Sequence, residues 1–218
     1  MNEAANIGPL IERLSRTPGV GEVVVADGGS TDGTLEFVRS SAVRLVRSGA
    51  GRGVQLNAGA RATSGDVLLF LHADVVPPPD VALQIRNAVE AGRIGGNFRL
   101  SYPEGGVLGR WLELLHPFYR ALGRYYGDSG IFVRRDVYER IGGFPEIPVM
   151  EDIMFVHGME RAGDTAYLTG PMVSSPRRWK DRPWRTLLLW GFMQVAFALG
   201  VNSQRLASFY KAHDAQER

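Results

Sequence analysis

Short apolar runs alternate with amphipathic stretches along the 218 residues of this chain. Three runs rich in Val and Leu, each followed by polar or turn-forming residues, are expected to be buried strands: residues 22–26, 43–46 and 66–71. Stretches with apolar residues three and four positions apart are expected to be helices: residues 6–16, with Asn6 as the cap, 34–39, 54–62 and 77–91. This alternation predicts an α/β domain with a mainly parallel, Rossmann-like sheet flanked by helices, with the most apolar run, residues 66–71, at the centre.

The second half of the chain is less regular. Strands are expected at residues 95–100 and 130–134, and helices at residues 107–124, 136–141 and 151–162. No repeat, low-complexity segment or linker divides the chain, so residues 1–218 are expected to form a single domain.

Residues 187–201 are apolar on all sides except at Gln194. As a helix this segment would be roughly 22 Å long, short of the ~30 Å hydrocarbon core of a bilayer, which disfavours a spanning helix. Two interpretations stay open: a helix packed on the domain or in a homo-oligomer interface, or a helix lying on a membrane surface.

The composition limits which metal ligands, nucleophiles and binding partners the protein can have. Hydrophobic residues at 44% and charged residues at 22% are ordinary for a soluble globular protein, and a net charge of +2 gives no indication of nucleic-acid binding. The absence of cysteine excludes disulfides, thiolate metal sites and a cysteine nucleophile, so any metal must be held by oxygen or imidazole. Residues 1–6 are polar and do not read as a signal peptide; we expect a cytoplasmic protein, with peripheral contact at the inner membrane face left open.

Carboxylates follow two of the expected strands. Asp27 comes directly after residues 22–26, in a glycine-rich turn, at the strand end where open α/β sheets bind ligands. The alternative is a turn in which Asp32 caps the next helix.

Asp74 follows residues 66–71. With His72 it is a candidate ligand for a Mg²⁺ or Mn²⁺ ion that bridges two phosphates. The alternative is that Asp74 only ends the strand.

The second half holds two further charged groups. Glu151 and Asp152 stand at an expected helix start, where the helix dipole stabilises acids, and they also suit a general base. Arg177, Arg178 and Trp179 form a group in which paired guanidinium groups suit a diphosphate and the indole suits a sugar. The alternative is a solvated basic turn with its Trp in the core.

A glycine-flanked arginine, Arg52, opens the helix expected at residues 54–62. Glycines and a helix N-terminus make a phosphate environment. Gln55 and Asn57 on this helix are equally compatible with ordinary exposed positions.

The order of these motifs resembles the family-two glycosyltransferases with the GT-A fold, and within them a small bacterial subgroup described as "transferase 2, rSAM/selenodomain-associated". The resemblance covers almost the whole chain and rests on six segments: residues 2–7 (NEAANI), 27–34 (DGGSTDGT), 51–60 (GRGVQLNAGA), 68–74 (LLFLHAD), 142–152 (GGFPEIPVMED) and 177–179 (RRW). It implies a nucleotide-binding half at about residues 1–75, an acceptor and catalytic half at about 76–180, and an apolar helical segment at about 183–213.

The resemblance also implies roles for individual residues. Glu3 and Asp27 would contact the ribose and base of a nucleoside-diphosphate sugar, with Arg52 and Gln55 nearby. Asp74 would hold the metal with His72, and Asp152 would be the catalytic base supported by Glu151. Arg178 and Trp179 match the end of the family's Gln-x-x-Arg-Trp motif and would contact the donor.

Three features depart from the family pattern. His72 stands where the first acid of the metal motif is usual, and Ser175 stands where the Gln of Gln-x-x-Arg-Trp is usual. The family also has an apolar strand before Asn2-Glu3, and without it we expect an unfilled slot in the centre of the sheet.

We therefore expect an inverting, metal-dependent glycosyltransferase that uses a nucleoside-diphosphate sugar, with UDP-sugars favoured and the acceptor unspecified. The alternative is a nucleotide-sugar-binding module without transferase activity. A nucleotidyltransferase is disfavoured, because no glycine-rich loop with basic residues follows the first strand.

Overall fold

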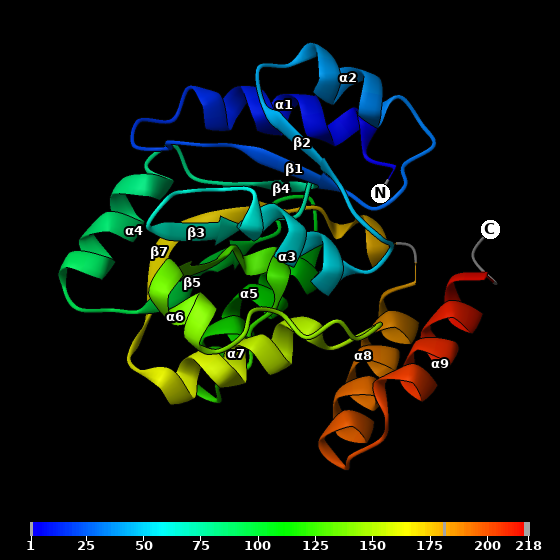
Figure 1. Ribbon diagram of the computed structural model, residues 1–218. Helices are drawn as coiled ribbons and strands as arrows, with labels where there is room; N and C mark the ends of the chain where they lie inside the picture. Colours follow the sequence, from blue (N-terminus) through cyan, green and yellow to red (C-terminus); the bar gives the residue numbers. More distant parts are fainter. Residues whose placement is uncertain (1, 181, 216–218) are drawn as a thin grey trace.

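The computed structural model describes residues 2–180 and 182–215, without the side chains of Arg178 and residues 210–215 (Figure 1). The strands are β1 Val24–Asp27, β2 Arg44–Arg47, β3 Val67–Phe70, β4 Val75–Val76, β5 Gly95–Ser101, β6 Ile131–Arg134 and β7 Thr165–Ser174. The helices are α1 Ala4–Ser15, α2 Thr34–Ser40, α3 Arg52–Arg61, α4 Val81–Glu90, α5 Gly106–Ala121, α6 Arg135–Arg140, α7 Glu151–Ala162, α8 Pro183–Ala198 and α9 Ser203–Ala215, with short 3₁₀ turns at Gly127–Ser129 and Pro176–Arg178.

The described strands form two sheets. β1 and β2 pair in parallel, and a second sheet has the order β3-β6-β5-β7-β4. The expected α/β class is confirmed, but only β1–β2 and β5–β7 pair in parallel, while the β3–β6, β5–β6 and β4–β7 ladders are antiparallel. An apolar run marks a buried strand without encoding its direction, which is why the sequence overstated the parallel pairing.

A cavity of about 880 Å³ lies between β1 and β3 and is also lined by residues of α1, α3 and α4. The expectation that β3 is a central strand is wrong, because β3 forms hydrogen bonds only with β6 and is the edge strand of its sheet. The cavity agrees with the expectation of an unfilled slot in the sheet. Within the described residues, β1 and β3 have no strand paired to the edges that face each other across it.

The main core lies on the five-stranded sheet. Phe144 and Phe155 stack with ring centroids 4.0 Å apart, and Phe70 of β3 meets Phe144 edge-on at 4.9 Å. The β1–β2 sheet has a smaller core, built from Ile7 and Ile11 of α1 and a few neighbours. The first part of the chain thus rests on less buried apolar surface than the second.

The start of α1 differs from the expectation, because the helix begins at Ala4 and Asn6 lies inside it. Asp32 serves two helices at once: its carboxylate accepts hydrogen bonds from the backbone N–H of Ala4 (3.1 Å) and of Thr34 (3.0 Å). A cap supplied from a distant turn leaves no local signal, so the nearer Asn6 was the wrong choice.

Strand β7 was not expected, because Gly170-Pro171 interrupts its sequence and a Gly-Pro pair normally argues against a strand. The structure accommodates the pair with a register shift opposite Phe98 and Leu100 of β5. Gln84 of α4 accepts a hydrogen bond from the Gly170 N–H at 3.0 Å, which satisfies a backbone donor at the irregularity.

The C-terminal segment is a hairpin of two helices, α8 and α9, joined at about residues 199–202. Its inner face contains Met193, Ala196 and Leu206, and it packs against Val149 and Met150 ahead of α7. Among the described residues, no helix is long and apolar enough to cross a membrane.

The split sheet predicts uneven local stability. We expect backbone amides of β1 and β2 to show protection from hydrogen exchange at least about tenfold lower than those of β5 and β6, because local opening is cheapest where few apolar contacts must be broken. Native-state hydrogen exchange by mass spectrometry measures this directly. Equal protection across both sheets would show that the cavity does not weaken the first part of the domain.

Candidate functional site

The turn after β1 is organised around Asp27. Its buried carboxylate accepts hydrogen bonds from the backbone N–H groups of Gly29 and Ser30 and from the Ser30 hydroxyl. Burial acts to raise the pKa of Asp27, but the hydrogen bonds from Ser30 and Gly29 outweigh it and hold the pKa below its ordinary value. Asp27 therefore shapes its own turn, and its contact with a ribose or base stays a prediction.

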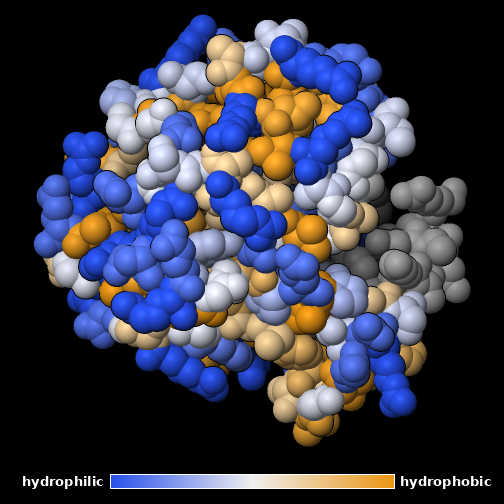
Figure 2. Space-filling view, viewed as in Figure 1, coloured by the Kyte–Doolittle hydropathy of each residue, from blue (hydrophilic) through white to orange (hydrophobic). Residues whose placement is uncertain are grey.

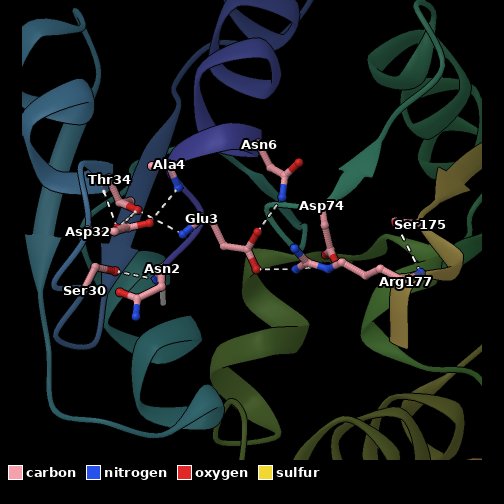
Figure 3. Close-up of polar contacts among 10 residues, drawn as sticks. All are labelled: Asn2, Glu3, Ala4, Asn6, Ser30, Asp32, Thr34, Asp74, Ser175 and Arg177. Atoms are coloured by element: carbon pink, nitrogen blue, oxygen red, sulfur yellow. Dashed lines mark hydrogen bonds and ion pairs between the residues drawn. The ribbon is translucent and has the colours of Figure 1, made fainter. Parts of the chain in front are cut away.

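Three residues far apart in sequence meet near the start of α1 (Figure 3). The Arg177 guanidinium donates a hydrogen bond to Glu3 and lies 2.9 Å from the carboxylate of Asp74. Both carboxylates are largely buried, whereas the Arg177 side chain is 43% exposed. The hydrogen bond to Glu3 and the charge of Asp74 raise the pKa of Arg177, so a permanent cation sits between the two acids.

The turn after β1 fixes the position of Glu3. The Glu3 backbone N–H donates to the Thr34 hydroxyl at 2.9 Å, and the Glu3 carboxylate accepts from the Asn6 side-chain amide at 2.6 Å. Asn2 donates its backbone N–H to the Ser30 hydroxyl at 3.0 Å. These contacts bring Glu3 beside the segment that carries Ser30, Asp32 and Thr34, as Figure 3 shows.

Helix α3 links this region to the start of α7. Arg52, the first residue of α3, lies 3.2 Å from the Glu151 carboxylate. Gln55 donates to the Ala26 carbonyl at 3.2 Å, and its amide packs so closely on Gly28 that a Cβ there would lie 2.8 Å from the Gln55 Cδ. Both predicted donor-site residues of α3 thus contact other parts of the candidate site, while their contact with a nucleotide stays a prediction.

The acid pair opens α7 after Met150, which adopts a left-handed conformation with φ of 67°. Glu151 and Asp152 are both buried. Burial and the neighbouring charge of Asp152 raise the pKa of Glu151, partly offset by the charge of Arg52. Asp152 accepts a hydrogen bond from the Gly127 backbone N–H at 3.1 Å.

His72 lies against the same glycine. A Cβ on Gly127 would fall 2.6 Å from the His72 Nε2, so the loop at residue 127 brings His72 and Asp152 to one place. Among the described residues, no group of three or more His, Cys, Asp and Glu side chains could hold a metal ion. Asp74 and His72 therefore suit a metal only if most of its ligands are oxygens of a bound molecule and water.

Trp179 is 4% exposed and meets Tyr102 edge-on at 5.6 Å, and it packs against Gly105 at the start of α5. This matches the alternative in which the indole is a core anchor, and its stacking on a sugar stays a prediction. The predicted donor contact of Arg178 concerns a side chain outside the described residues.

The structure also identifies two residues whose roles sequence reasoning missed. Arg177 was seen only as one of a basic pair, although it contacts Glu3 and Asp74. Asn57, treated as compatible with an exposed position, is buried: it accepts from the Tyr138 hydroxyl and the Phe144 N–H and donates to the Phe144 carbonyl. A polar residue at a helix position that faces the core signals a buried side chain with hydrogen-bond partners in another part of the chain.

The Arg177 cluster yields a prediction about charge. Arg177→Gln should lower the free energy of unfolding at pH 7 by about 1 kcal/mol, because two largely buried carboxylates lose their cation while the exposed guanidinium limits the loss. Added Mn²⁺ should restore part of this stability in the variant and have little effect on the parent protein. Urea titrations with and without Mn²⁺ measure both effects.

Arg134→Gln is the matched control, since Arg134 also pairs with a carboxylate, that of Asp136, but at an exposed position. It should cost little stability and gain no response to Mn²⁺. If Arg177→Gln behaves like this control, Arg177 does not balance the charge of Asp74 and Glu3.

Comparison with known proteins places these features in a family. The sequence model described as Glycosyl transferase family 2 matches residues 1–139. The glycosyltransferase AglE of Haloferax volcanii is 26% identical over 183 residues, which cover 76% of this chain and 60% of AglE. The chain thus spans about 60% of the length of this relative.

Two solved structures share the fold. Glucosyl-3-phosphoglycerate synthase from Mycobacterium tuberculosis, in complex with Mn²⁺, UDP and glucosyl-3-phosphoglycerate, superposes with a TM-score of 0.64 at 23% identity, covering 91% of this chain and 76% of the other. The mannosyltransferase PcManGT from Pyrobaculum calidifontis, with GDP-Man and Mn²⁺, gives 0.63 at 22% identity, covering 89% and 59%. These likenesses confirm the expected GT-A-like fold, and the match to more than half of the sequence shows that the chain belongs to glycosyl transferase family 2.

Proposed function

We propose that the protein is an inverting glycosyltransferase that transfers a sugar from a nucleoside-diphosphate sugar to an acceptor hydroxyl. The observation that carries the proposal is the meeting of Glu3, Asp74 and Arg177, drawn from three distant parts of the chain. Carboxylates and a guanidinium at one point suit a ribose, a metal ion and a diphosphate. Within the family, we assign the chain to the rSAM/selenodomain-associated subgroup on the motifs of its sequence.

A divalent cation, Mg²⁺ or Mn²⁺, would be held by Asp74, with His72 as a second ligand or as support. When bound, such an ion neutralises negative charge that develops on the departing diphosphate. The solved relatives named above contain Mn²⁺ with UDP or with GDP-Man, which supports a nucleotide-linked metal. The Arg177 guanidinium can contact diphosphate oxygens bidentately, as expected of the pair Arg177 and Arg178, and Arg178 would assist by contacting the donor.

The candidate base is Asp152. It would take the proton from the acceptor hydroxyl while the hydroxyl oxygen forms a bond to the anomeric carbon. The bond from that carbon to the diphosphate oxygen breaks on the opposite face, so the configuration inverts and the nucleoside diphosphate leaves with the electron pair. Glu151, which lies 3.2 Å from the Arg52 guanidinium, would position Arg52 and support Asp152.

UDP-sugars are the favoured donors, and GDP-sugars are the next choice because the solved mannosyltransferase PcManGT contains GDP-Man. The alternative function is a nucleotide-sugar-binding module without transfer, which the substitution of His72 for an acid favours. Nucleotide binding without turnover distinguishes that alternative.

Nucleotide binding is tested by thermal unfolding with UDP and with GDP, each with and without Mn²⁺. A ligand that binds only the folded state raises the melting temperature by mass action, so we expect the largest shift with one nucleotide plus Mn²⁺. Asp74→Asn should remove the part of the shift that needs Mn²⁺, whereas Asp80→Asn, at an exposed position, should keep it. The absence of a shift with either nucleotide in a cooperatively melting protein would contradict the donor site.

Turnover is tested by the release of UDP from UDP-glucose with a panel of hydroxyl acceptors that includes phosphoglycerate. Asp152→Asn should lower the rate by about 10²–10⁴-fold, the usual contribution of a general base, with nucleotide binding retained. Asp136→Asn, on the surface, is the control. NMR of the product should show the anomeric configuration opposite to that of the donor. Full activity in Asp152→Asn would eliminate this residue as the base.

A further inference from the structure

Helix α8 exposes a continuous apolar stripe. Its members are Trp184, Leu188, Phe192 and Val195, with Leu199 at the C-terminal cap; they follow one another at spacings of three and four residues, and their exposed fractions lie between 52% and 80%. Positions with this spacing share one face of a helix. Soluble proteins rarely leave so much contiguous apolar surface exposed unless it binds something.

The stripe lies on a part of the molecule that projects from the domain. In Figure 1 the α8–α9 hairpin extends away from the sheets, and Figure 2 shows hydrophobic atoms gathered at its free end. The inner face of the hairpin is already occupied by Met193, Ala196 and Leu206. The exposed stripe is therefore a second apolar face. Phe192 within it meets Phe209 of α9 edge-on at 6.0 Å, and all five side chains of the stripe remain more than half exposed.

Helix α5 carries a similar stripe. Val107, Trp111, Leu114, Phe118 and Leu122 have the same spacing and exposed fractions between 56% and 74%. Trp179, four residues before Pro183, packs against Gly105 and Gly109, so α5 begins beside the segment that leads into α8. Both stripes contain aromatic side chains, which favour the boundary between water and hydrocarbon.

The charges around α8 are mainly positive. Residues 180–218 contain six Lys and Arg residues, at positions 180, 182, 185, 205, 211 and 218, and three acidic residues, Asp181, Asp214 and Glu217, which leaves a net charge of +3. Residues 186–204 carry no ionisable side chain at all. An apolar face flanked by arginines is complementary to a surface with an apolar interior and anionic groups at its edge.

We infer that the α8–α9 hairpin docks on an anionic lipid surface, with the stripe of α8 in the headgroup region and the arginines at the phosphates. A symmetric pairing of two copies through this face fits less well. It would place two hairpins against each other, each with three Lys or Arg residues and one acidic residue within residues 183–215, so the pairing would join two surfaces of net positive charge.

The experiment is co-sedimentation of the full chain with vesicles of phosphatidylcholine alone and of phosphatidylcholine mixed with phosphatidylglycerol. We expect several-fold more protein bound to the anionic vesicles, and less binding at higher salt because the arginine contribution is screened. Leu188→Glu should reduce binding at least about tenfold, since it replaces an inserted apolar side chain by a charge.

Leu83→Glu is the matched control, because Leu83 is an exposed leucine on α4, away from the hairpin, and its substitution should leave vesicle binding unchanged. Melting temperatures of both variants close to that of the parent protein confirm that they are folded. Three outcomes would overturn the inference: no binding to anionic vesicles, equal loss in both variants, or a lipid-free dimer that Leu188→Glu converts to a monomer. Nucleotide binding is measured separately, so failure here leaves the proposed reaction standing.

Discussion

The β1–β2 sheet is held to the rest of the domain by side chains rather than by a strand ladder. Across the cavity, the described contacts include Arg13 to the Pro77 carbonyl, Glu22 to the Ser64 N–H, and the guanidinium of Arg177 between Glu3 and Asp74. A ladder fixes two strands through a continuous series of backbone hydrogen bonds, whereas these contacts are separate side-chain interactions: one hydrogen bond from Arg13, two from Ser64 to Glu22, and the contacts of Arg177 with two carboxylates. The candidate site formed by Glu3, Asp74 and Arg177 therefore lies across the boundary between the β1–β2 sheet and the five-stranded sheet.

The contacts of Arg177 with Glu3 and Asp74 therefore help to hold the two sheets together, in addition to balancing the two acidic charges. Glu3 belongs to the β1–β2 side and Asp74 to the β3 side, so the cation that balances them also connects the two parts. Any ligand that brings its own positive charge to Asp74 must share that carboxylate with Arg177 or displace the guanidinium from it. Because Arg177 is well exposed, it can turn toward solvent or toward a diphosphate at modest cost.

The sequence predicted most elements but not how they are joined. Runs such as residues 66–71 mark buried strands, and the amphipathic period marks α1 and α4, because burial of one face is a local property of the pattern. The edge position of β3, the double capping by Asp32 and the strand across Gly170-Pro171 depend on partners distant in sequence. The site shows the same division. Acids at strand and helix ends were readable as candidates, whereas Arg177 and buried Asn57 acquire their roles only from the fold.

The hairpin and the candidate base are neighbours in this fold. Val149 and Met150 pack against the inner face of α8–α9, and the next residues are Glu151 and Asp152. Met150 holds a left-handed backbone conformation that costs a non-glycine residue roughly 1 kcal/mol or more, so the surrounding packing must maintain it. The same packing fixes the direction in which α7 starts and hence where the Asp152 carboxylate meets the Gly127 N–H. A partner that reorients the hairpin would thus act on the acid pair through this packed contact, and Arg52 of α3, which pairs with Glu151, connects the acid pair in turn to the β1–β2 side.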